Sequence, residues 1–249
     1  MYKHIIIIFL VTSCLFAQNF TFSQGAIVRG DTSKKQISLV FTGHEYSDGG
    51  EHILNVLNTY KVPGTFFFTG KFYKENEELI RQIKKSGHYL GPHSYDHLLY
   101  CSWENRDSLL VTKDEFIDDL NKNYQIMKEY GIEKANIFLP PYEWYNQQIA
   151  DWCNEIDITL INMSHGTLSH TDYTFPSMKR YWSSDTIYKS IIEYEETSTN
   201  GLNGFILLVH IGTNPERTDK FYFRLEELIM ELQDKEYEFI KIKVLVKGQ

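Results

Sequence analysis

Short apolar runs alternate with segments of helical spacing along most of the chain. The apolar runs are typical of buried strands and cover residues 36–42, 65–69, 137–139, 159–162, 204–210 and 238–246. Apolar residues at helical spacing, with start and stop signals, predict helices over residues 51–60, 77–85, 112–130, 147–155, 185–196 and 221–235. This alternation predicts βαβ units and a mainly parallel sheet in one domain of α/β-barrel size.

The N-terminal segment has the pattern of a signal peptide over residues 1–17. Lys3 and His4 provide a short basic start, residues 5–11 are an unbroken apolar run, and Ala17 is a small residue suited to cleavage. The apolar run is too short to span a bilayer. We therefore expect an exported protein, periplasmic or at the cell surface, with no transmembrane segment.

Cys14 offers an alternative, because the residues before it loosely match a lipid-attachment motif and it could carry a lipid anchor. Residues 18–35 are polar and rich in small residues, which predicts a flexible lead-in before a domain over residues 36–249. Cys101 and Cys153 are then the only other cysteines, too few for a disulfide framework, although one bridge between them stays open.

Composition narrows the class of partner. The formal net charge is −8, which disfavours nucleic acid. Aromatic residues make up 15% of the chain, a level compatible with a sugar-stacking cleft or with an ordinary core. The polar and aromatic segment 164–183 is long for a linker and is expected to be an active-site loop.

Two histidines, His93 and His97, stand four residues apart after a short apolar segment. Residues with this spacing share one face of a helical turn, so both imidazoles could point at one cation. A strand-to-helix loop at a barrel mouth would place them where functional sites cluster. The alternative from spacing alone is a pair of surface histidines.

Three motifs resemble those of the polysaccharide deacetylases, the NodB-homology or carbohydrate esterase family 4 group. Residues 93–97 (HSYDH) match the family's H-(S/T)-x-x-H, residues 65–70 (TFFFTG) its second strand, and residues 208–210 (LVH) its terminal L-x-H. The resemblance covers roughly residues 36–242. It implies a distorted (β/α) barrel, a divalent metal (zinc most often) held by an aspartate and two histidines, and removal of acetyl groups from glycans.

The resemblance implies that His210 is the general acid and that His93 and His97 are metal ligands. The family's T-F-D-D-G, which carries the base and then the ligand aspartate, has its nearest equivalent at residues 46–49 (YSDG). Asp48 would then be the third ligand, with a serine where the base should stand. A strict strand register would instead place Thr42 and Gly43 at those two positions.

Other motifs depart further from the family. Its R-x-P-Y becomes residues 139–142 (LPPY), without the arginine, and its aspartate-tryptophan motif is not visible in residues 161–165. A general base must still take a proton from water. Glu45 is the first candidate, Glu143 the second, and His44 a weaker candidate for base or metal ligand.

Tyr142, Glu143 and Trp144 could form an aromatic sugar platform with an acid beside it, or simply pack. The sequence thus predicts a metal-dependent hydrolase that removes acetyl groups from a polysaccharide or oligosaccharide outside the cytoplasm. The loss of the usual base and arginine keeps an alternative open, a catalytically weak or inactive barrel that binds carbohydrate.

Overall fold

A curled sheet of seven strands forms the centre of the molecule in a computed structural model that describes residues 20–133 and 135–247. The strand order is β1-β2-β8-β3-β4-β5, and β9 pairs with the start of β3. The strands are β1 (Thr21–Ser23), β2 (Ala26–Arg29), β3 (Gln36–Gly43), β4 (Gly64–Phe68), β5 (Tyr89–Pro92), β8 (Phe205–His210) and β9 (Glu238–Phe239). The pairs among β8, β3, β4 and β5 are parallel, whereas β2 runs antiparallel to β8.

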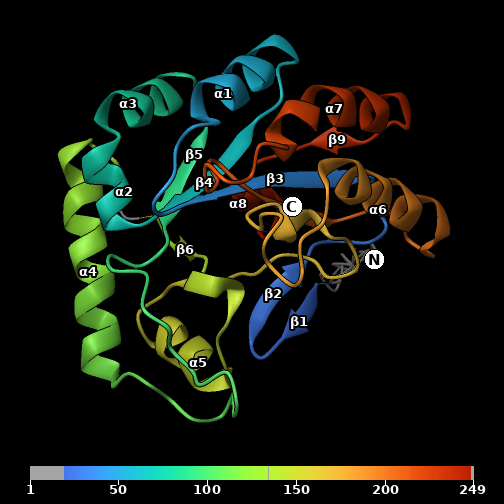
Figure 1. Cartoon of the computed structure of the whole chain (residues 1–249). Coiled ribbons are helices and arrows are strands. Elements are labelled where there is room, and N and C mark those ends of the chain that lie inside the picture. Colours follow the sequence, from blue (N-terminus) through green and yellow to red (C-terminus); the bar gives the residue numbers. More distant parts are fainter. Residues whose placement is uncertain (1–19, 134, 248–249) are drawn as a thin grey trace, which may run out of the picture.

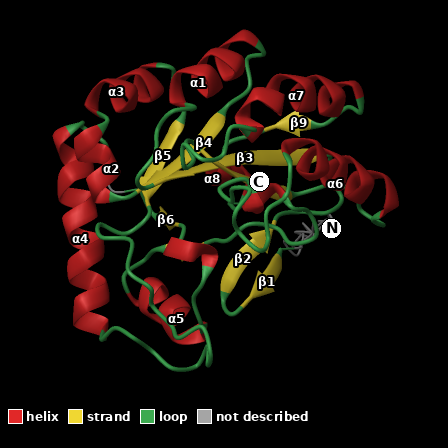
Figure 2. Cartoon of the chain, in the orientation of Figure 1, coloured by secondary structure: helices red, strands yellow, loops and turns green. Residues whose placement is uncertain are grey.

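Two short strands, β6 (Ile137–Phe138) and β7 (Thr159–Leu160), form a separate parallel pair. One bridge between Ile27 and Ile161 brings this pair to the β2 side of the main sheet, and β6 also contacts β5. Figure 2 shows the strands curving about the middle of the molecule with helices around them. The predicted single α/β domain with a distorted barrel is confirmed in this form.

Most of the helices lie around the outside of the sheet, whereas Ile242 and Leu245 of the last helix pack in the barrel interior. They are α1 (Gly50–Thr59), α2 (Gly70–Glu75), α3 (Glu77–Lys85), α4 (Lys113–Glu129), α5 (Gln147–Glu155), α6 (Ser184–Thr197), α7 (Leu225–Asp234) and α8 (Ile242–Leu245). In Figure 1, α1 lies between α3 and α7 on one side of the sheet, and α4 runs beside α2. The capping box expected at Thr112 is present at the start of α4.

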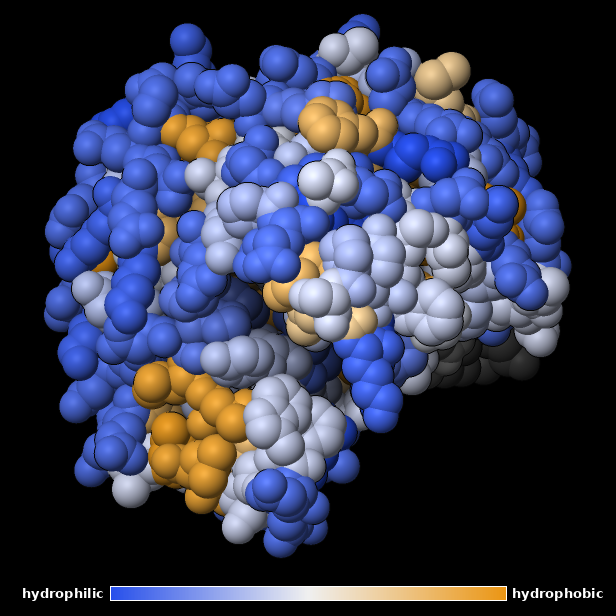
Figure 3. Space-filling model, viewed as in Figure 1, coloured by the Kyte–Doolittle hydropathy of each residue, from blue (hydrophilic) through white to orange (hydrophobic). Residues whose placement is uncertain are grey.

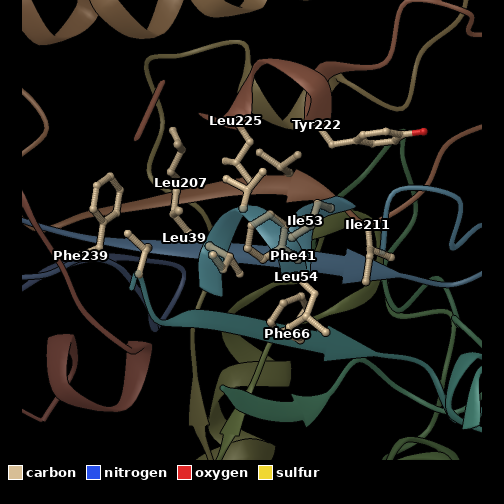
Figure 4. Close-up of a cluster of buried hydrophobic side chains, with 14 of the residues drawn as sticks. Leu39, Phe41, Ile53, Leu54, Phe66, Leu207, Ile211, Tyr222, Leu225 and Phe239 are labelled. Atoms are coloured by element: carbon tan, nitrogen blue, oxygen red, sulfur yellow. The ribbon is translucent and has the colours of Figure 1, made fainter. Parts of the chain in front are cut away.

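Residues alternate between the two faces of β3, which gives the domain two apolar layers. Leu39 and Phe41 face the helices and pack with side chains such as Ile53 and Leu225, as the cluster in Figure 4 shows. Val40 faces the opposite way, into a second cluster in the barrel interior. The outer surface is mostly hydrophilic on the face drawn in Figure 3, with separate apolar patches.

Two expectations about the chain ends are wrong. The lead-in 18–35 is not flexible over its described part, because β1 and β2 form a hairpin there and Ala26, Ile27 and Val28 are buried. The last predicted strand, 238–246, is only β9 followed by the short helix α8. An apolar run of this length does not distinguish a strand from a short buried helix.

The predicted signal peptide and Cys14 lie outside the described residues. Within the described part, no helix combines the length and apolar character needed to cross a bilayer. Cys101 and Cys153 are both buried free thiols, so the bridge left open between them is not formed.

Candidate active site

The carboxyl ends of β3, β4, β5 and β8 lie along one rim because these strands are parallel neighbours. Thr42 at the end of β3 is in register with His210 at the end of β8. A cleft of about 440 Å³ opens at this rim. Its lining residues are Thr42, Gly43, His44, Glu45, Tyr46, His93, His97, Trp103, Tyr142, Glu143, Tyr173, Phe175, Met178, His210, Gly212, Thr213 and Asn214.

The histidine loop that follows β5 is held by helix α4. Both carboxylate oxygens of the buried Asp119 accept backbone N–H groups of this loop, from Tyr95 at 2.7 Å and from Asp96 at 3.0 Å. Ser94 and His97 have φ of 67° and 57°, in the left-handed region that such residues rarely adopt. The pair therefore lies on a loop after β5, as expected, but this loop is strained and is not a helical turn.

Both loop histidines are neutral at neutral pH. Burial, with smaller contributions from the neighbouring histidines, lowers the pKa of His93 to about 3 and that of His97 to about 2; the hydrogen bond of His93 to Leu139 opposes the shift of His93. His93 Nδ1 donates to the carbonyl oxygen of Leu139 at 2.8 Å, which leaves its Nε2 as a lone-pair acceptor.

His210 is paired with a carboxylate that the sequence did not reveal. Asp172 is 1% exposed; its Oδ1 lies 2.6 Å from His210 Nδ1, and its Oδ2 accepts the backbone N–H of His210 at 2.9 Å. Burial lowers the pKa of His210, but the charge and hydrogen bond of Asp172 and the charge of Glu143 outweigh it and raise the pKa. The available signal was an acid followed by an aromatic, Tyr173, in the expected active-site loop.

Arg217 fixes the loop that carries Asp172. Its guanidinium is completely buried and donates to the carbonyl oxygens of Thr174 and Trp182 and to the hydroxyl of Ser184. These bonds tie segment 164–183, identified above as an active-site loop, to the segment after β8. The loop is therefore a fixed wall of the cleft.

Glu143 lies in the cleft on a strained turn. It and Tyr142 are consecutive residues with φ of 52° and 60°. Burial raises the pKa of Glu143 to about 7; the charge of His210 opposes this and that of Asp172 adds to it. Strain of this kind costs energy and tends to persist at functional sites.

The predicted platform is only partly in place. Tyr142 and Glu143 line the cleft, as does Glu45, but Trp144 does not. Trp144 packs against Trp103 instead, with ring centroids 5.4 Å apart. Trp103 also lines the cleft, although the sequence did not single it out.

The profile described as polysaccharide deacetylase matches residues 29–161. The chain belongs to this polysaccharide deacetylase family. The peptidoglycan-N-acetylmuramic acid deacetylase PdaA of Bacillus subtilis is 32% identical over 117 residues, which are 47% of this chain and 41% of that protein. A peptidoglycan-N-acetylglucosamine deacetylase of Bacillus cereus is 24% identical over 215 residues, 86% of this chain and 90% of the other.

Solved structures agree on the fold. A family 4 carbohydrate esterase pseudoenzyme from Bacillus anthracis superposes with a TM-score of 0.70 and 22% identity, over 90% of this chain and 69% of the other. The structure of Bacillus subtilis PdaA superposes with a TM-score of 0.70 and 23% identity, over 89% of this chain and 85% of PdaA. A mutant of the pseudoenzyme is described as having restored enzymatic activity. At these identities the likeness extends to the fold alone.

This member of the polysaccharide deacetylase family has no carboxylate at the end of β3. Thr42 and Gly43 occupy the strand end, as the strict register expected, and both line the cleft. The buried hydroxyl of Thr42 has no hydrogen-bond partner among the described residues. A Cβ on Gly43 would come within 2.8 Å of side-chain atoms of Ile211 and Phe72, so the packing excludes a side chain there.

The prediction that Asp48 joins His93 and His97 as a metal ligand is not met. Asp48 is absent from the cleft lining, because its oxygens accept from the backbone N–H of Thr213 at 2.8 Å, from Tyr222 at 2.8 Å and from Lys220 at 3.0 Å. Burial raises the pKa of Asp48, but these bonds outweigh it and lower the pKa. Asp48 thus fastens the loop after β3 to the segment after β8.

The remaining donors do not complete a three-ligand site. The rings of His93 and His97 are inclined at 58°, so two lone pairs could meet at one point. The ring of His44 is stacked on that of His97, 4.4 Å away at an angle of 11°. An imidazole binds a metal in its own plane, so two nearly parallel rings do not share one ion. Within residues 20–133 and 135–247, no three His, Cys, Asp or Glu side chains gather to hold a metal.

We expect Asp48→Ala to reduce stability rather than zinc binding. Losing three hydrogen bonds to a partly exposed carboxylate should lower the free energy of unfolding by about 1–2 kcal/mol in urea denaturation. Because folding lowers the pKa of Asp48, this contribution is present at neutral pH and disappears as pH falls through that pKa.

His93→Ala is the matched control for the loss of a candidate zinc ligand, since His93 lines the cleft. Calorimetric titration with zinc should give the same affinity for wild type and Asp48→Ala. A loss of zinc binding in Asp48→Ala at unchanged stability would restore Asp48 as a ligand.

Proposed function

We propose that this protein removes acetyl groups from a glycan bound in the cleft, with Glu143 as general base and His210 as general acid. The observation that carries the proposal is the placement of a carboxyl group with a pKa near 7 and an Asp172-paired histidine in the same cleft. Membership of the polysaccharide deacetylase family supports acetylated glycans as the substrate class.

The reaction needs one proton removed and one delivered. Glu143 takes a proton from a water molecule while the oxygen of that water attacks the acetyl carbonyl carbon. Protonated His210 then gives its Nε2 proton to the sugar oxygen as the carbon–oxygen bond breaks, which releases acetate and a free hydroxyl. Asp172 holds the ring through Nδ1 and stabilises the imidazolium.

The two candidate glutamates differ in burial, because Glu45 is exposed and Glu143 is partly buried. Glu143 and Glu45 both line the cleft, but burial raises the pKa of Glu143 to about 7. A base works best when its pKa lies close to the working pH, because it is then ionised and still basic. We therefore assign the role to Glu143, the second of the sequence-based candidates.

The reaction that we propose does not use a metal ion. The resemblance led us to expect zinc on an aspartate and two histidines, but within the described part of the chain only His93 and His97 are placed to share an ion, and no carboxylate joins them. Without that ligand a zinc ion would be held weakly. For such a site an ester is an easier substrate than an amide, so we propose O-acetyl rather than N-acetyl groups.

Binding without catalysis is the second candidate function. It is favoured by Thr42 and Gly43, which leave neither of the family's two aspartates at the end of β3. The cleft, its aromatic walls and the fixed loop 164–183 would then serve recognition of the carbohydrate alone.

We also propose that the protein acts after export, in the periplasm or at the cell surface. The basic start, apolar run and small residue of segment 1–17 support this location, and Cys14 supports a lipid anchor as the alternative to free release.

Glu143→Gln should lower acetate release from O-acetylated xylo-oligosaccharides by about 10²–10⁴-fold, because one general base typically contributes that much. The amide keeps the shape of the side chain but cannot take the proton. Acetate would be measured enzymatically in steady state with the full chain.

Glu45→Gln is the matched control, a second cleft-lining glutamate changed in the same way. It should keep most of the activity. If Glu45→Gln is the inactive variant, the base is Glu45. If the wild type binds the oligosaccharide and releases no acetate, the binding-only function holds.

The pH profile of acetate release should be bell-shaped. Activity should rise as Glu143 ionises, with an acid limb near pH 7, and fall again at higher pH as His210 loses its proton. Asp172→Asn keeps an oxygen that accepts from Nδ1 but removes the charge that raises the pKa of His210. The alkaline limb should therefore move to lower pH. A lower rate with an unshifted alkaline limb would show that Asp172 has only a structural role.

A further inference from the structure

A row of aromatic rings in edge and tilted contacts connects Trp103, which lines the cleft, to the ring of His97. Trp103 meets Tyr142 edge to face at 5.7 Å, and Tyr142 lies 4.3 Å from the ring of His97. On its other side Trp103 packs against Trp144 at 5.4 Å, and the guanidinium of Arg106 lies 4.3 Å over Trp144. One end of the row is thus packed against Trp144 and Arg106, and the other end contacts His97 in the cleft.

Trp103 remains widely exposed within this row. It is 57% exposed although it has aromatic neighbours, and it lines the cleft. Tyr173, 46% exposed, lines the cleft as well and lies 5.2 Å from the ring of His210. A large apolar ring held rigid and left uncovered at a cleft mouth is suited to contact a ligand.

The charge of the cleft selects among glycans. Among the described residues that line it, none is a lysine or an arginine, whereas Glu45 and Glu143 are acids. An anionic sugar would therefore meet repulsion with no fixed cation to offset it.

The cationic side chains near the cleft are paired, buried or outside its lining. Lys71, close to His44, is bonded to Asp96 at 2.9 Å. Arg217 is completely buried behind the loop, and Arg180, near Tyr173, is exposed and does not line the cleft.

We infer that the cleft takes a neutral acetylated glycan, and that the sugar next to the acetylated one stacks on Trp103. The C–H groups on one face of a neutral pyranose carry slight positive charge and match the negative face of the indole ring. This inference rests on the proposed function and names its substrate class and a specificity-determining residue.

The test compares two acetylated oligosaccharides by calorimetric titration of the full chain. One is a neutral O-acetylated xylo-oligosaccharide and the other an anionic O-acetylated oligogalacturonate of the same length. The neutral probe should bind at least about tenfold more tightly, and its affinity should not change with salt. Equal or tighter binding of the anionic probe would overturn the inference.

Trp103→Ala should weaken binding of the neutral probe by about tenfold, and Trp103→Phe should recover part of the loss. Trp182→Ala is the matched control, because Trp182 is 43% exposed and does not line the cleft. The control should bind like the wild type. Unchanged binding by Trp103→Ala would overturn the stacking site.

Failure of the proposed function is distinguishable. If the wild type binds the neutral probe through Trp103 but releases no acetate, only catalysis is lost and the inference stands. If it binds neither probe and releases no acetate, both fall together.

Discussion

The parallel pairing of β3 with β4 and β8 is the constraint from which the cleft follows. This register sets Thr42 beside His210 and aligns the end of β4 with the end of β5. The loops that leave these strands must therefore meet at one rim, where the backbone is no longer bound into the sheet. The apolar layers on both faces of β3 stabilise this register, because a slip by one residue would exchange the two faces.

Three polar attachments then turn the rim into a defined site. Asp119 holds the histidine loop through backbone N–H groups, Arg217 holds the loop that carries Asp172, and Asp48 fastens the loop after β3. Each uses a charged side chain to satisfy polar groups of a neighbouring segment, which is how irregular backbone becomes fixed. The strained turn at Glu143 is held in a similar way, because the buried Asn162 donates to the carbonyl oxygen of Glu143 at 2.9 Å.

Most of the fold could be predicted from the sequence because strands such as residues 36–43 are continuous apolar runs. The histidines of the site could also be predicted, since His93, His97 and His210 belong to short local motifs. Asp172 could not, because it is 38 residues from His210 and only folding joins them. Asp48 was misassigned because an acid before two glycines resembles a ligand turn, whereas β3 extends to Gly43 and takes up the strand end.

We propose that acetyl transfer to water depends on Glu143 and His210, which differs from the metal chemistry that the family resemblance implies. The most direct measurement is acetate release from an O-acetylated xylo-oligosaccharide by the wild-type chain after exhaustive chelation, with zinc content checked by mass spectrometry. The metal-free protein should release acetate at nearly the rate of the zinc-supplemented protein. Acetate release that vanishes on chelation and returns with zinc would contradict this proposal.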